Sequence, residues 1–180
     1  MKRLIGIKAS VAVLVSLVMI TPFVFAADLS QDQVARYLLA TAKAFRSVYS
    51  RDIVEEAKRG GVKPAENWKE NEHAIMLPAQ FIKAAGAEIK DFELSLIGLT
   101  PIYKSNLPKT KAEADALKKL AAQPDLKVIT FADGDQFKGI SADFAIAQGC
   151  ADCHNAHPSS PRKNFKKGDL MGAVVVRLHK

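Results

Sequence analysis

Apolar side chains recur at steps of three and four residues between positions 34 and 53. The sequence from Ser30 to Gln33, directly before this run, matches a capping box, which marks the start of a helix. Gly60-Gly61 and then Pro64 mark its end. The spacing therefore predicts a long amphipathic helix that runs to about Lys58. We expect its buried face to carry Val34, Leu38, Ala42, Phe45, Tyr49 and Ile53.

Two further helices are predicted downstream. Pro78 suits the first turn of a helix from Ala79 to about Lys90, and a second capping box at residues 110–113 opens a helix that Pro124 stops. The positions expected to face inward are Phe81, Ile82, Ala85 and Ile89 in one helix and Ala114, Leu117, Leu120 and Ala121 in the other. Residues 65–76 are polar and indicate a loop or a short helical turn.

The apolar period changes to two in four other segments, which predicts strands. Residues 92–96 alternate, and residues 100–103 continue the extended pattern after a bend at Gly98. Residues 127–131 and 136 to about 146 are joined by the hairpin signal Asp133-Gly134. Residues 170–178 form a half-buried last strand. Its apolar face carries Leu170, Gly172, Val174, Val176 and Leu178, and its other face carries Met171, Arg177 and His179.

These elements predict an α+β fold in a single domain over residues 27–180. The long N-terminal helix and two others pack on an antiparallel sheet of about four strands, and the segment around residue 150 is inserted before the last strand. Residues 155–167, rich in Pro, Ser, Lys and Arg, are expected to form a surface loop.

The first 26 residues are predicted to be an export signal and not part of the fold. Residues 1–8 are cationic, residues 9–20 are apolar, and Val24-Phe25-Ala26 suits a cleavage site before Ala27. The alternative is an uncleaved membrane anchor, because residues 9–27 are uncharged over nearly the length of a short membrane helix. Either interpretation places the rest of the chain outside the cytoplasm, and we expect a periplasmic protein.

The net charge of the chain is a weak indication of its partner. The 180 residues are 25% charged and 48% hydrophobic and carry a net charge of +7, which first suggests a nucleic-acid partner. Three of the 26 basic residues lie in the export signal and none of the 19 acidic ones does, so the remainder has a net charge of only +4. Export and this mild charge argue against nucleic-acid binding.

The sequence from Cys150 to His154 has the Cys-x-x-Cys-His pattern of c-type haem attachment. Each thiol adds to one haem vinyl group and forms a thioether, and the two intervening residues let a single helical turn reach both vinyl groups. His154, directly after Cys153, then lies under the iron and supplies its proximal imidazole ligand. The pattern predicts one covalently bound haem c.

Two other interpretations of the cysteines remain open. A redox-active pair of the thioredoxin type needs the two thiols but not the histidine. A zinc site needs a fourth ligand, for which His157 is available. The exported context and the complete five-residue pattern favour haem over both.

The position of the motif narrows the kind of haem protein. Only 26 residues follow His154, which excludes the small electron carriers whose methionine ligand lies far downstream. Cytochromes c-prime carry the motif near the C-terminus but end in the helix that holds it, whereas this chain ends in a predicted strand. We rank the c-prime interpretation second.

The sequence resembles a family of exported c-type haem domains with a PAS-like fold, many of which are sensor modules of histidine kinases or cyclases. The resemblance rests on Cys150 to Pro158, Ser160-Pro161, and residues 165–169 running into residues 171–175, with residues 77–81 as a second block. It implies a PAS-like sheet. No output domain follows Lys180, so we expect any signalling to pass through a separate protein.

The remaining candidate residues surround the expected haem. His73 or Met76 is a candidate for the sixth iron ligand, against an open or water-bound iron. His157 is expected to contact a haem propionate or the backbone, and Asn155, inside the shared block, is counted with the cofactor-binding residues. Arg162 leads a basic cluster, with Lys163, Lys166 and Lys167, that either pairs with haem propionates, steers an acidic redox partner or is simply solvated.

The sequence thus predicts an exported monohaem c-type cytochrome domain that serves redox or small-ligand sensing. The alternative is a periplasmic electron carrier with a six-coordinate haem. The partner would be an unidentified redox or signalling protein, and a small gas is a candidate ligand. An enzyme ranks third, because no Ser/His/Asp set or paired carboxylates stand out, and no catalytic residue is predicted.

Overall fold

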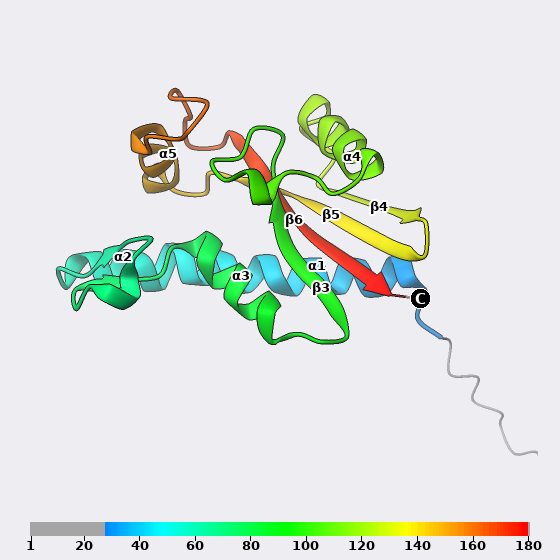
Figure 1. Ribbon diagram of the computed structural model, residues 1–180, viewed down its shortest axis with the longest axis horizontal. Coiled ribbons are helices and arrows are strands. Elements are labelled where there is room, and N and C mark those ends of the chain that lie inside the picture. Colours follow the sequence, from blue (N-terminus) through cyan, green and yellow to red (C-terminus); the bar gives the residue numbers. More distant parts are fainter. Residues whose placement is uncertain (1–27, 180) are drawn as a thin grey trace, which may run out of the picture.

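The computed structural model describes residues 28–179, so the predicted export signal lies outside the described residues. Its centre is a sheet of four strands: β3 (Phe92–Ile97), β4 (Val128–Asp133), β5 (Gln136–Phe144) and β6 (Leu170–His179). Their order is β3-β6-β5-β4, and all neighbours are antiparallel. Helices lie on both sides of this sheet (Figure 1). The predicted α+β class and the four-stranded antiparallel sheet are confirmed.

A long helical run opens the described chain. It consists of α1 (Gln31–Val48), a π-helical turn η1 (Tyr49–Ile53) and α2 (Val54–Arg59). The capping box forms as predicted: the Ser30 hydroxyl accepts from the Gln33 backbone N–H at 3.2 Å, and the Gln33 side chain accepts from the Ser30 N–H at 3.0 Å. The predicted helix end near Lys58 is also confirmed.

The buried face of this helical run differs in part from the predicted one, although Ala42 is buried and Val34 and Leu38 pack against the core as predicted. Ala35 and Leu39 are fully buried, whereas Phe45 and Ile53 are 63% and 52% exposed. Gly139 of β5 gives the reason, because a Cβ at that position would lie 2.8 Å from Leu39 Cδ1 and 3.1 Å from Ala35 Cβ. The missing side chain lets α1 place these two residues directly on the sheet, which turns Phe45 and Ile53 outward. Their predicted burial is wrong.

The segment between α2 and α3 (Pro78–Glu88) is more ordered than the predicted loop. Strands β1 (Lys63–Pro64) and β2 (Ala74–Ile75) pair in parallel, with a 3-10 turn η2 (Trp68–Glu70) between them. The Tyr49 ring of η1 stacks on Phe81 of α3 at a centroid distance of 4.5 Å, and the Tyr49 hydroxyl donates to the Met76 carbonyl at 2.7 Å. These contacts hold the segment against the helical run.

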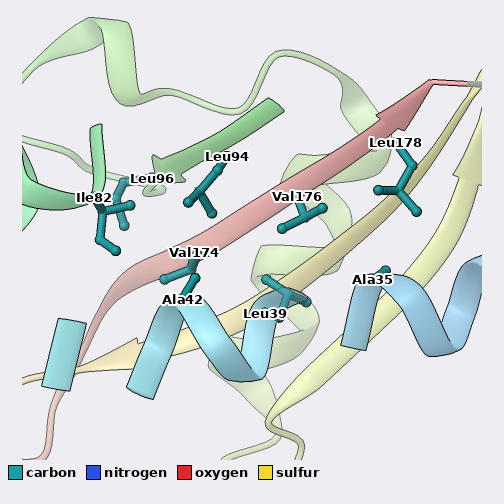
Figure 2. Close-up of a cluster of buried hydrophobic side chains, with 9 residues drawn as sticks. All are labelled: Ala35, Leu39, Ala42, Ile82, Leu94, Leu96, Val174, Val176 and Leu178. Carbon is teal, nitrogen blue, oxygen red and sulfur yellow. The ribbon is translucent and has the colours of Figure 1, made fainter. Parts of the chain in front are cut away.

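Apolar clusters cover both faces of the sheet. The cluster between the sheet and the helices α1 and α3, drawn in Figure 2, contains Ala35, Leu39, Ala42, Ile82, Leu94, Leu96, Val174, Val176 and Leu178. The cluster on the opposite face lies under α4 (Lys111–Ala122) and contains Ile97, Ala116, Leu117, Leu120, Ile140, Ala142, Ala173 and Val175. In α4, Leu117 and Leu120 are buried as predicted, but Ala121 is exposed and Glu113 points inward.

Strand β6 is buried on both faces, and the predicted half-buried strand is wrong. Arg177, expected on the open face, is only 1% exposed. Its Nε and Nη2 donate to the two carboxylate oxygens of Glu113 at 2.7 and 2.9 Å. Because α4 brings this carboxylate over the sheet, the charged residue is tolerated where the sequence pattern predicted solvent.

The predicted hairpin is confirmed and the predicted bend is not. Asp133 pairs with Gln136, and the loop between them begins at Gly134, whose φ of 64° suits a two-residue hairpin turn. Strand β3, by contrast, ends at Ile97. The Gly98 N–H donates to the Asn106 carbonyl at 2.9 Å, which folds residues 99–106, including the 3-10 turn η3 (Lys104–Asn106), back on the sheet end.

Candidate haem pocket

Helix α5 (Gln148–Ala156) carries the Cys-x-x-Cys-His motif and joins β5 to β6. It lies beyond the end of the sheet, at the same end of the molecule as α2 and away from the β4–β5 hairpin (Figure 1). Cys150, Cys153 and His154 stand at positions i, i+3 and i+4 and so share one face of the helix. All three line the same pocket.

The helical run from α1 to α2 supplies another wall of this pocket. Arg46, Ser50, Val54 and Lys58, each four residues apart, line it. In a regular α-helix a step of four residues overshoots one turn by about 40°. Over the π-helical turn η1 the same step falls short of a turn, which keeps the four side chains aligned. Such π-turns are frequent at functional sites.

The remaining walls are mostly apolar. They come from the start of α3, the adjoining ends of β3 and β6, the loop after β3 and the segment after α5. The apolar side chains among them are Leu77, Pro78, Ala79, Leu96, Ile97, Pro101, Ile102, Phe165, Met171 and Ala173. A concave, largely apolar site with a few polar groups is typical of a cofactor pocket.

The two thiols are free and not joined by a disulfide. Partial burial, together with the nearby Glu66 carboxylate and Cys150, raises the pKa of the Cys153 thiol. A redox-active pair of the thioredoxin type has, by contrast, a lowered thiol pKa. Within residues 28–179 no group of three or more His, Cys, Asp or Glu side chains is placed to hold a metal ion, which gives the zinc interpretation no support.

His154 is half-buried against the ring of Phe165, which meets it edge-on at a centroid distance of 5.6 Å. Burial lowers the pKa of the imidazole, and the positive charge of Arg46 and the neighbouring His157 lower it further. A neutral imidazole is the form that binds iron. The side chain is therefore suited to the proximal role predicted for it.

Asn155 is predicted to bind the cofactor, but its side chain is engaged elsewhere. Its Nδ2 donates to the Phe165 carbonyl at 2.9 Å, and its Oδ1 accepts from the Phe165 N–H at 2.8 Å. This double hydrogen bond ties the segment after α5 back to the helix. Asn155 thereby holds the Phe165 ring against His154, which is a positioning role.

The chain matches, over residues 26–178, the family model described as "Tll0287-like: Tll0287". The chain belongs to the Tll0287-like family. It is also similar to the crystal structure of the cyanobacterial heme-protein Tll0287, with a TM-score of 0.56 and 15% identity over 84% of this chain and 98% of that one. No curated protein matches the sequence. These findings confirm the family resemblance and the fold class; at this identity the structural likeness concerns the fold alone.

In this Tll0287-like chain, His157 lies at the pocket mouth with both ring nitrogens in contact. Its Nδ1 accepts from the Ser159 N–H at 3.1 Å, so in the neutral ring the proton is on Nε2, which faces a Glu66 carboxylate oxygen at 3.3 Å. The Tyr103 ring stands edge-on to it at 5.8 Å. These contacts hold three loop segments together at the opening.

The predicted role of Arg162 at haem propionates receives no support from its placement. The guanidinium lies over the Phe165 ring at 4.3 Å and pairs with Asp169 at 2.5 Å. Arg162 is not among the pocket-lining residues. Within the segment predicted to be a plain surface loop, Phe165 and Ser160 are buried, so that prediction holds only in part.

Neither candidate for the sixth iron ligand lines the pocket. His73 is exposed, and its carbonyl accepts from the Lys63 N–H beside the small β1–β2 sheet. Met76 is held at its backbone by Tyr49. The sequence predicted a loop or a short turn for this segment. The β1–β2 pairing orders it instead, with Pro64 and Leu77 lining the pocket and His73 and Met76 outside its lining.

Met171, which the strand pattern placed with Arg177 and His179 on the less apolar face of the last strand, lines the pocket. The pairing of β5 with β6 steps from Asp143–Gly172 to Phe144–Leu170 and so passes over Met171. A bulge of this kind re-aims one side chain and is common beside functional sites. A two-residue alternation cannot reveal it.

Sequence reasoning also missed a buried ion pair in the pocket wall. Arg46 Nη1 lies 2.8 Å from Asp143 Oδ1, and the two side chains are 13% and 12% exposed. Arg46 shares its helix face with Ser50, Val54 and Lys58, and this four-residue spacing was the signal that the sequence offered.

None of the helices within residues 28–179 is both long and apolar enough to cross a bilayer.

Proposed function

We propose that this chain is an exported c-type cytochrome domain that binds one haem covalently and serves small-ligand or redox sensing. The observation that carries the proposal is that Cys150, Cys153 and His154 share one face of α5 and line one largely apolar pocket. The family model, and the heme-protein whose fold the chain shares, support a haem as the occupant.

The residues of the pocket fit such a group. Cys150 and Cys153 would hold a haem through two thioether bonds, each thiol giving its sulfur to one carbon of a vinyl group and its hydrogen to the other carbon. His154 would be the iron ligand, with Phe165 and the Asn155 hydrogen bonds fixing its ring. When bound, the haem supplies one-electron chemistry and an iron site for small ligands.

Sensing is favoured by the wall that the helical run presents. Arg46, Ser50, Val54 and Lys58 contribute no imidazole or thioether to it, and the predicted ligands His73 and Met76 lie outside the pocket. The iron would then keep an exchangeable sixth position, which is what a module that binds a small gas requires.

Electron transfer is the second candidate, because Met171 lines the pocket. A thioether ligand would give a six-coordinate haem of the kind found in electron carriers. The exposed residues Lys163, Lys166 and Lys167 after α5 would then steer an acidic redox partner.

Export is part of the proposal and rests on the sequence of residues 1–26. Their cationic start, apolar run and Val24-Phe25-Ala26 ending are typical of a cleaved signal peptide, and haem c in a periplasmic domain agrees with this. We propose a signalling or redox protein in the same compartment as the partner. N-terminal sequencing of the mature protein tests the cleavage before Ala27.

An optical spectrum of the haem-loaded protein in both oxidation states, with and without carbon monoxide, tests the function. Sensing predicts that carbon monoxide shifts the Soret band of the reduced form readily. An electron carrier would resist the gas, and Met171→Ala would remove that resistance. His154→Ala is expected to change the Soret band and spin state, whereas His179→Ala, at the exposed end of β6, is the matched control. An unchanged spectrum of His154→Ala contradicts the assignment.

A further inference from the structure

Arg46 has unused hydrogen-bonding capacity in the pocket wall. Its guanidinium pairs with Asp143, with Nη1 lying 2.8 Å from Oδ1. Its Nε is buried, and within residues 28–179 it has no hydrogen-bond partner. A guanidinium offers five N–H donors, and a buried donor without an acceptor costs free energy. The side chain lines the same pocket as His154.

Two cations share the Asp143 carboxylate. Asp143 on β5 faces both Arg46 and Lys43 of α1, and Lys127 acts in turn on Lys43. Burial raises the pKa of the Asp143 carboxyl, while Arg46 and Lys43 oppose that rise. Two other carboxylates line the pocket, but Glu55 pairs with Lys58 and Glu66 faces His157, so neither is engaged with Arg46.

We propose that Arg46 is the carboxylate-binding residue of the haem pocket: its guanidinium, oriented by Asp143, takes a second carboxylate inside the pocket. The inference rests on the proposed function. The carboxylate has two sources with the same chemistry, a propionate of the covalently bound haem or a small free carboxylate that enters the pocket. Arginine suits this role because its planar fork matches the geometry of a carboxylate.

The test uses the haem-loaded protein and the double variant Arg46→Gln/Asp143→Asn, which removes the guanidinium without leaving a buried carboxylate unpaired. Arg51→Gln is the matched control: Arg51 lies on the same helical run, is 66% exposed and pairs with the neighbouring Asp52. Sodium formate is titrated into the oxidised protein and followed at the Soret band. The midpoint reduction potential is then measured against pH without formate.

Binding of formate to wild type that weakens about tenfold or more in the double variant supports Arg46 as the receptor of a free carboxylate. If wild type does not bind formate, a haem propionate is the partner. The curve of midpoint potential against pH then moves to higher pH in the double variant, because a carboxylate without its guanidinium keeps its proton longer. Arg46→Lys keeps the positive charge but not the planar guanidinium. It is expected to change the formate affinity or the pH dependence of the potential in the same direction as the double variant, and it replaces the double variant if that protein does not fold.

Two results would overturn the inference. If the double variant and Arg46→Lys both match Arg51→Gln in formate affinity and in the pH dependence of the potential, Arg46 binds no carboxylate, and the proposed function stands. If wild type holds no covalent haem, the proposed function fails and the inference fails with it.

Discussion

Two largely buried arginines, Arg177 and Arg46, differ in how many of their guanidinium nitrogens have a partner. Arg177 is 2% exposed and fully engaged: Nε and Nη2 bind Glu113, and Nη1 binds Glu93 at 2.8 Å. Arg46, whose side chain is 13% exposed, pairs with Asp143, and among residues 28–179 its Nε has no hydrogen-bond partner. The same side chain is closed into a network in one region and left partly open in the other.

The network around Arg177 extends through Lys138, which is 3% exposed and binds both Glu113 at 2.9 Å and Asp133 at 2.8 Å. Lys109 adds a contact to Glu93 at 2.7 Å. A buried charged network with each member satisfied fixes the packing of α4 on the sheet and has no capacity for a ligand. The Arg46–Asp143 pair, by contrast, lies in the wall of a pocket. We therefore regard the charges around Arg177 as structural and those around Arg46 as suited to binding.

The largest effect is expected from removing Arg177. Arg177→Met leaves Glu113 and Glu93 short of a buried partner and should lower the free energy of unfolding by about 3–5 kcal/mol. Arg46→Met should cost only about 1–2 kcal/mol, because Asp143 keeps Lys43 nearby and takes up a proton more easily. Urea unfolding of both variants measures the two costs. Equal costs would contradict the distinction drawn between the two regions.

The second-largest effect is expected from acid, which should weaken the ion-pair network of Arg177, Glu113 and Lys138. The hydrogen bonds from Arg177 and Lys138 outweigh burial and lower the pKa of Glu113 from 4.5 to about 2. Because the pKa is lower in the folded protein, the stabilisation is fully present above about pH 4.5 and is lost as the pH falls toward 2. It amounts to about 3 kcal/mol. Urea midpoints across this range measure it.

The control for this acid effect is Glu113→Gln, in which that part of the pH dependence should disappear. Glu56→Gln, at an exposed ion pair with Arg59 on α2, should leave the acid curve unchanged. A wild-type curve that stays flat between pH 4.5 and 2 would show that Glu113 does not hold the network together.

A smaller effect is expected at the pocket, from Asn155. Asn155→Ala removes two hydrogen bonds to the Phe165 backbone and should cost about 1–2 kcal/mol of unfolding free energy. It should also broaden the Soret band, because the His154 ring loses its fixed neighbour. Asn67→Ala, at an exposed residue before η2, should change stability by less than about 0.5 kcal/mol. A spectrum and stability equal to wild type would contradict the positioning role.

Local sequence patterns were sufficient to predict much of the fold. Some patterns involve only residues that are close in the sequence, and each of these predicts a particular local structure. They are the capping box at Ser30, the hairpin at Asp133-Gly134 and the motif at Cys150. The fold class followed from the order of these elements. The family match and the shared fold agree with it.

What the sequence could not predict depends on contacts between distant segments. Phe45 has an apolar side chain in a helical period, yet Gly139 on a distant strand decides which face of α1 is buried. Arg177 was assigned to solvent because its partner Glu113 lies 64 positions away. Met171 reaches the pocket only through a bulge in the β5–β6 pairing. None of these contacts leaves a periodic trace in the sequence.

The central claim is that Cys150 and Cys153 attach one haem beside His154. The most direct test is the intact mass of the acid-denatured, purified protein, expressed with the cell's c-type haem attachment machinery. The mass is predicted to equal that of the polypeptide plus one haem, and Cys150→Ala/Cys153→Ala should give the mass of the polypeptide alone. A wild-type mass without haem, or haem retained by the double variant, would contradict the account.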